Sequence, residues 1–321
     1  MKNIKLINLR VLAILLVVFG HSIIIYSPFW GYYNSIHEVP ILAAIKDIIN
    51  VIQMPLFFSI SGYLFCNALS KKITFKKIIF NKCKRLIIPF LLIGLCWMIP
   101  IKILINYSNY NGRSIFGILK TFIFGQDLGH LWYLPTLFII FIIMYLFNKL
   151  LSLIKTNKKI DLLILIVLFI LSLFASKYHY HIFLNNPAIY LLYFYVGLLV
   201  NKYEKKVLSW NRFLISIIFA ILMYAAVRLF DNTLNCLTAI IGIVALYKIL
   251  PNKTNKVFSI VDRNSFGIYL FHSPLIYITY YFFANTNPIF VVFLNFLVFG
   301  ILSIVLTELI RKTKLKFILG E

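Results

Sequence analysis

Apolar stretches of about 20 residues follow one another along almost the whole 321-residue sequence. A helix needs about 20 apolar residues to cross the hydrocarbon core of a bilayer. Hydrophobic residues make up 62% of the chain and charged residues 13%, whereas a soluble domain is about half apolar and a quarter charged. The alternating pattern of a membrane β-barrel is absent. We therefore predict an all-α, polytopic membrane protein that forms a single domain over residues 1–321.

Hydropathy predicts about ten transmembrane helices. They lie near residues 9–28, 48–68, 86–105, 131–148, 160–175, 188–200, 213–229, 234–250, 264–283 and 289–310. The apolar segment 115–124 is shorter and contains Lys120, so we expect a re-entrant or interfacial helix there. The N-terminal apolar run resembles a signal peptide but has no convincing small-residue cleavage site, so we expect a retained first helix.

Lysine and arginine are distributed unequally between the predicted connections. All but six of the 32 basic residues lie at the ends that alternate with the N-terminus. The exceptions are Lys46, Lys102, Arg113, Lys120, Lys177 and Arg228. The positive-inside rule then places both termini in the cytoplasm. We expect the protein in the inner (cytoplasmic) membrane of a cell. The net charge of +23 follows from this topology, so we expect the lipid bilayer as a partner and no nucleic acid.

Arg10 and His21 are the only strongly polar residues in the run 9–26. Their spacing of eleven residues returns them to one helix face, about 16 Å apart along the axis. Alone, Arg10 is typical of a positive-inside anchor. An ionisable residue such as His21 inside a span indicates function rather than packing. The four cysteines show neither a C-x-x-C spacing nor a histidine-containing cluster, so no metal site is predicted.

Two other predicted spans carry polar groups at a matching depth. Ser265, Tyr269 and His272 follow i, i+4, i+7 spacing, which places them on one helix face. Ser61 lies ten residues before Lys71, about 15 Å from the basic surface. We expect His21, His272 and Ser61 to share one layer, whereas Gly62 is more typical of a close helix contact.

The segment His130 to Pro135 opens the fourth predicted span at its outer end. Trp132 and Tyr133 are typical of the aromatic belt that many membrane helices place at the interface. Sequence alone leaves open whether His130 and Trp132 bind a substrate or only anchor the helix.

Five motifs together resemble the acyltransferase-3 membrane family, whose bacterial members O-acetylate cell-surface polysaccharides. The motifs are the Arg10 to His21 spacing, PLFFSISGYLF at 55–65, KRLIIPF at 84–90, HLWYLP at 130–135 and SFGIYLFHSPL at 265–275. They occur in the order of the family and extend over almost the whole chain. One position departs from its pattern, because Asn8 stands where many members carry an acidic residue.

The resemblance implies an O-acyltransferase with no tightly bound cofactor, which uses cytoplasmic acetyl-CoA or another acyl-CoA as donor and a saccharide hydroxyl as acceptor. The anionic coenzyme suits Arg10, Arg85 and the loop 71–84. His21 is the expected base and His272 a relay or acceptor-binding group. Ser61, Tyr269 or backbone groups near Gly62 would stabilise an oxyanion.

Two other functions remain open at this stage. A flippase or exporter of a lipid-linked saccharide would also have many spans, although none of the nine acidic residues falls in the middle of a predicted span, as ion coupling commonly requires. A non-catalytic scaffold would leave the histidines at matching depth unexplained.

Overall fold

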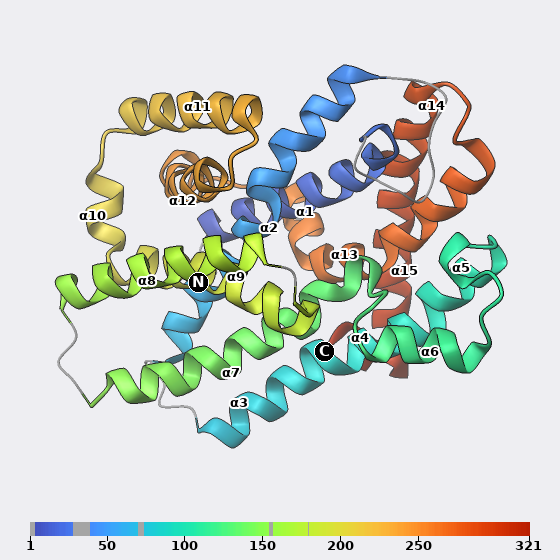
Figure 1. The fold of residues 1–321 in the computed structure, drawn as a ribbon, viewed down its shortest axis with the longest axis horizontal. Coiled ribbons are helices and arrows are strands. Elements are labelled where there is room, and N and C mark those ends of the chain that lie inside the picture. The colour runs from blue at the N-terminus through green and yellow to red at the C-terminus, as the bar shows by residue number, and fades with distance from the viewer. Residues whose placement is uncertain (1–3, 28–38, 70–73, 154–156, 179) are drawn as a thin grey trace. The chain divides into compact units, whose positions relative to one another are not determined.

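The computed structural model describes residues 4–27, 39–69, 74–153, 157–178 and 180–321 (Figure 1). Every regular element in these ranges is a helix. Nine helical segments within them are long and apolar enough to cross a membrane. The prediction of an all-α, polytopic membrane protein is therefore confirmed.

The α-helices have the following bounds. They are α1 (Ile4–Ser22), α2 (Pro40–Leu69), α3 (Phe75–Lys82), α4 (Ile88–Ile93), α5 (Ile99–Leu104), α6 (Ile115–Ile123), α7 (Tyr133–Leu151), α8 (Lys158–Lys177), α9 (Ile182–Lys202), α10 (Glu204–Ser209), α11 (Arg212–Leu229), α12 (Asn232–Ile249), α13 (Lys256–Phe283), α14 (Pro288–Phe293) and α15 (Phe299–Arg311). Short π-helices join α3 to α4 (η2, Cys83–Ile87), α4 to α5 (η3, Gly94–Met98) and α14 to α15 (η6, Leu294–Val298), and the 3-10 helix η5 (Gly129–Trp132) precedes α7.

Nine of the ten predicted spans coincide with the nine apolar helical segments. The remaining prediction, 264–283, falls inside α13, which has 28 residues and is thus about 42 Å long. Polar side chains such as His272 and Thr279 interrupt its apolar sequence, and α13 is not among the nine segments. The segment 115–124 forms α6, a helix of nine residues, too short to span the hydrocarbon core.

The chain groups into two compact units, each built from three stretches of sequence. Unit 1 contains Met1–Arg10, Val51–Cys83 and Tyr133–Thr254, and unit 2 contains Val11–Asn50, Lys84–Trp132 and Asn255–Glu321. Because these stretches interleave along the chain, neither unit is a continuous segment. That residues 1–321 form a single domain stays a prediction.

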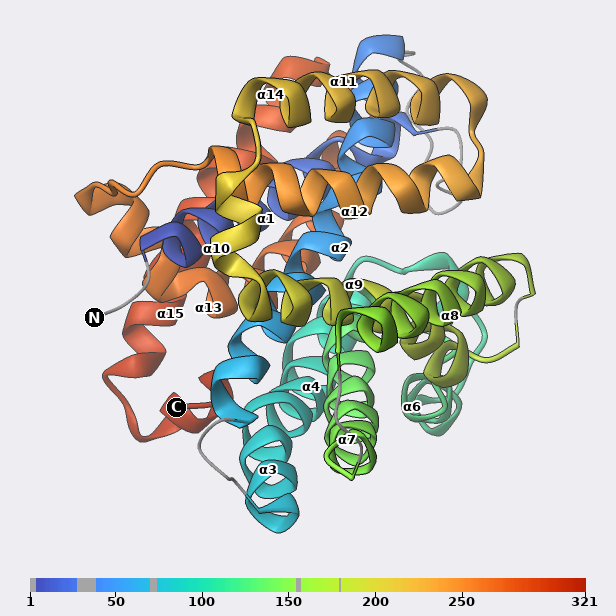
Figure 2. The same ribbon diagram turned by 90° about the vertical axis from the view of Figure 1, so that its left-hand side faces the viewer.

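Unit 1 is held together by helices that pack side by side. The closest-packed pairs are α11 with α12 and α8 with α9. Figure 2 shows α11 running alongside α12, which Figure 1 shows nearly end-on. A Cβ at Gly62 would overlap the Phe194 carbonyl, and one at Gly197 would overlap the backbone of Ser59. Backbones of α2 and α9 approach this closely only where glycine is present, which confirms that Gly62 is a packing residue.

Unit 2 is organised around α13. This helix packs along α15, and Gly267 is required there because a Cβ would overlap the Thr307 side chain. Near the end of α1, Ile23, Tyr26 and Tyr280 belong to one buried apolar cluster. The end of α1 is thereby packed against the second half of α13.

Candidate functional site

Three histidines from distant parts of the sequence meet in unit 2. His21 lies near the end of α1, His130 in η5 and His272 in the middle of α13. The His21 and His272 rings stack with centroids 5.1 Å apart, and the His130 ring meets His272 edge-on at 5.6 Å. His272 is completely buried and His130 nearly so. The fold therefore brings together three of the histidines that the sequence singled out.

The hydrogen bonds of the pair determine which ring nitrogen carries a proton. His272 Nδ1 lies 2.7 Å from the Ile268 carbonyl oxygen, which only accepts, so Nδ1 carries the hydrogen. In the neutral ring, Nε2 is then an acceptor, and it lies 2.8 Å from His21 Nδ1. His21 must donate from Nδ1, which leaves the lone pair on its Nε2. His21 Nε2 is thus the basic nitrogen of the pair.

A second residue of α13 fastens the backbone beside His21. The Tyr280 hydroxyl donates to the His21 carbonyl oxygen at 2.6 Å, and Tyr280 is almost fully buried. His272 and Tyr280 stand two helical turns apart on α13. His272 therefore holds the ring of His21 and Tyr280 holds its backbone, both from α13.

His130 is oriented in a way that leaves one nitrogen available. Its Nε2 donates to the Leu270 carbonyl oxygen at 3.2 Å, and the Tyr269 hydroxyl donates to its backbone oxygen at 2.6 Å. Among the described residues, its buried Nδ1 has no hydrogen-bond partner. The hydroxyl hydrogen of Tyr269 is therefore used to position the backbone of His130. Nδ1 of His130 offers a lone pair and can only accept a hydrogen bond.

A buried ion pair anchors the loop that carries His130. Lys102 Nζ lies 2.7 and 2.9 Å from the two carboxylate oxygens of Asp127, and Lys102 is completely buried. Next to it, Gly129 adopts φ +50°, a conformation that favours glycine, and a Cβ there would also press against Met98. Trp132, in the same 3-10 helix as His130, is half-buried.

Lys46 is a charged neighbour of His21 that the sequence did not single out. It lies in the first part of α2, is 4% exposed, and donates to Asn50 Oδ1 at 2.6 Å. Together with His272 and His130, its charge acts on the His21 ring. The available signal was its position two residues before the predicted span 48–68, where a modest extension of the helix places it inside the protein.

Arg10 and Ser61 belong to unit 1. Arg10 shares the continuous helix α1 with His21, as expected. The Ser61 hydroxyl lies 3.4 Å from the Tyr133 hydroxyl. That Ser61 shares a layer with the histidines stays a prediction.

Arg85 lies in η2, where its side chain is exposed. In the described part of the chain its guanidinium has no ion-pair partner closer than 4.0 Å. Gly320 packs closely against the backbone of Arg85. The lysines at the start of the predicted loop 71–84 lie outside the described residues.

Asn8 has a structural role that explains its departure from the acidic pattern. It is buried, and its Nδ2 donates to the carbonyl oxygens of Pro251 and Lys253, both at 2.9 Å. A carboxylate has no hydrogen to donate, so an acidic residue could not hold this turn in the same way.

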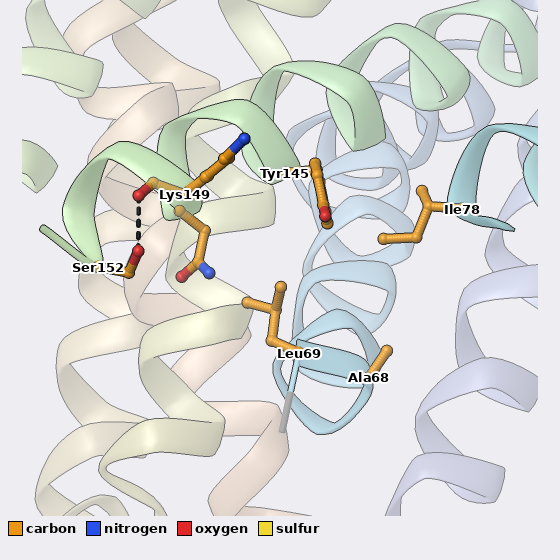
Figure 3. Close-up of a pocket in the computed structure, with 7 residues that line it drawn as sticks. Ala68, Leu69, Ile78, Tyr145, Lys149 and Ser152 are labelled. Carbon is orange, nitrogen blue, oxygen red and sulfur yellow. Dashed lines mark hydrogen bonds between the residues drawn. The ribbon is translucent and has the colours of Figure 1, made fainter. Parts of the chain in front are cut away.

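A separate cavity of about 190 Å³ lies in unit 1 between the ends of α2 and α7 and the start of α3. Figure 3 shows Tyr145, Lys149 and Ser152 on one side, with Leu69 and Ile78 facing them. The Ser152 hydroxyl donates to the Lys149 carbonyl oxygen. None of the predicted site residues and no histidine lines this cavity, so the histidine cluster remains the candidate reaction site.

Comparison by sequence matches residues 3–310 to a family model described as an acyltransferase domain. No curated protein and no solved structure matches the chain. The family match covers all five motifs, which confirms the resemblance seen in the sequence.

Proposed function

The chain belongs to the acyltransferase family matched over residues 3–310, and from that premise we propose that it moves an acetyl group from cytoplasmic acetyl-CoA to a hydroxyl of a cell-surface or lipid-linked saccharide. The observation that supports this most is the pair of His21 and His272, bonded at 2.8 Å with the basic nitrogen of His21 facing away from its partner. Hydroxyl acylation needs a base of near-neutral pKa, which imidazole supplies.

In the proposed reaction, His21 Nε2 takes the proton of the acceptor hydroxyl as its oxygen forms a bond to the thioester carbonyl carbon. The carbonyl electron pair moves onto oxygen and returns when the carbon–sulfur bond breaks. The departing thiolate takes the proton from His21, so the products are an ester and free coenzyme A. His272 positions His21 and accepts from its Nδ1 throughout, as the orienting member of a catalytic group.

His130 suits the binding of the acceptor. Its buried Nδ1 lone pair has no partner in the described part of the protein, and leaving such a group unsatisfied costs about 1–3 kcal/mol. A saccharide hydroxyl would supply the missing hydrogen. Trp132, which follows it closely in η5, adds an aromatic surface beside the same segment.

The donor side of the proposal rests on charge. Arg10 and Arg85 lie at the starts of the predicted spans 9–28 and 86–105. The distribution of basic residues assigns these ends to the cytoplasm, where the anionic coenzyme is found. Arginine forms bidentate bonds with phosphate. We therefore propose that both hold phosphates of acyl-CoA, that both termini are cytoplasmic, and that the protein acts in the cytoplasmic membrane.

Membranes that contain the protein should transfer radiolabelled acetyl from acetyl-CoA to saccharide, and membranes without it should not. Mass spectrometry of surface glycan from a deletion strain should show loss of one acetyl mass per modified unit. Translocation of a lipid-linked saccharide with no incorporated label would instead support the flippase alternative and reject the proposed reaction.

A further inference from the structure

Lys46 is a buried cation that forms no ion pair with any residue the structure describes. It is 4% exposed, and its ammonium donates to the amide oxygen of Asn50. Asp47, the next residue of α2, acts on it electrostatically but forms no ion pair with it in the described ranges. A buried ammonium is costly unless a negative charge compensates it, so this position calls for an anion during the working cycle.

The neighbourhood of Lys46 indicates which anion. Among the described residues, the ionisable groups that act on His21 are His272, Lys46 and His130. Two of them are imidazoles already assigned to the pair and to the loop before α7. Lys46 is therefore the cationic group among them. Its neighbour Ile49 on α2 belongs to the buried cluster of Ile23 and Tyr280, which flanks His21.

Three other polar side chains that contact the histidine pair or His130 have no hydrogen free for a ligand. The Tyr269 hydroxyl donates to the His130 carbonyl oxygen, and His130 presents a lone pair rather than a hydrogen. Tyr280 donates to the backbone of His21. Because an ammonium has three hydrogens and Asn50 takes one, Lys46 retains donors for a ligand.

We propose that Lys46 is a further catalytic residue, whose ammonium stabilises the negative charge that develops on the thioester carbonyl oxygen. This inference rests on the proposed acyl transfer. As the acceptor oxygen bonds to the carbonyl carbon and its proton passes to His21 Nε2, the carbonyl electron pair moves onto oxygen beside Lys46. The charge disappears again when the pair returns and the carbon–sulfur bond breaks. A fixed charge that faces the transition state raises turnover more than it tightens substrate binding.

Lys46→Gln removes the charge but keeps an N–H that can reach Asn50, and Lys46→Arg keeps the charge. Lys120→Met is the matched control, because Lys120 is an exposed lysine of the same unit. With each variant quantified in the membrane, kcat for Lys46→Gln should fall about 10²- to 10³-fold, which is the effect of losing one oxyanion donor. KM for acetyl-CoA and for acceptor should stay within about threefold of wild type, and Lys46→Arg should recover at least about tenfold of the lost rate.

Three results would overturn the assignment. A raised KM for the acceptor with kcat retained would mean that Lys46 binds an acidic group of the saccharide. Unchanged kinetics would remove it from the reaction, and absence of both Lys46 variants from the membrane would make it a structural residue. If the wild-type protein and the control Lys120→Met both transfer no acetyl group, the proposed function itself fails. If both are active, any result that contradicts the role of Lys46 concerns only this further inference.

Discussion

Unit 2 contains two buried lysines that have similar sequence contexts but different hydrogen-bond partners in the structure. Lys102 is completely buried, contacts both carboxylate oxygens of Asp127 and has the Tyr107 ring 4.3 Å from its ammonium. Lys46 is buried nearly as well but has one amide oxygen as partner. Both belong to the six basic residues on the predicted outer side.

This difference separates a charge used for folding from one left for a ligand. The carboxylate of Asp127 compensates the charge of Lys102. Burial beside this acid also raises the pKa of Tyr110, which lies outside the spans and close to the pair. Among the described residues no carboxylate forms an ion pair with Lys46, and its charge acts on the ring of His21, the proposed base. An uncompensated buried charge beside a base is typical of a functional site.

The largest effect is expected at the base. His21→Gln keeps a similar size and can still form hydrogen bonds, but glutamine does not titrate. Turnover should fall about 10²- to 10⁴-fold while the protein accumulates and binds acetyl-CoA normally. The measurement is the rate of acetyl transfer per amount of protein in the membrane.

His272→Gln provides the comparison within the pair. Its amide oxygen can still accept from His21 Nδ1, so it should lose less activity than His21→Gln. Near-normal turnover of His21→Gln would move the base to His272, and loss of the protein from the membrane would indicate that His21 is a packing residue.

A large effect on stability, rather than on chemistry, is expected at the other lysine. Lys102→Met leaves the Asp127 carboxylate without its partner, and breaking a buried ion pair in this way costs about 3–5 kcal/mol. Thermal unfolding of the purified protein in detergent should show the loss directly.

The double variant Lys102→Met/Asp127→Leu removes both charges and should regain most of that stability. If Lys102→Met were stable but inactive, Lys102 would belong to the reaction and the contrast with Lys46 would disappear.

The smallest effect is expected at an exposed cation. Arg85→Ala should raise the apparent KM for acetyl-CoA about two- to fivefold with little change in kcat, because exposed ion pairs contribute only about 0.2–1 kcal/mol. The effect should shrink with added salt, since exposed charges are screened. Steady-state kinetics at two salt concentrations would measure it, with Arg85→Lys as the charge-preserving control. A raised KM for the saccharide alone would contradict a role on the donor side.

The sequence by itself determined the class of fold and the general reaction class. Hydropathy is a local property, since each span must satisfy the bilayer along its own length, and nine spans could therefore be placed from it. His21 and His272 were identifiable because ionisable residues are rare in apolar segments. His130 stood out only as part of the motif at 130–135. The family motifs added the reaction class, which the match over residues 3–310 supports.

Only the tertiary structure decided how these residues work together. The protonated nitrogens of His272 and His130 follow from carbonyl acceptors on α13, and that of His21 follows from its bond to His272. Tyr269, expected near an oxyanion, donates to the backbone oxygen of His130. Lys46 and Lys102 cannot be distinguished by sequence, because a lysine's role depends on which side chains packing places around its ammonium. Such contacts join residues as far apart as His21 and His272, and no local pattern encodes them.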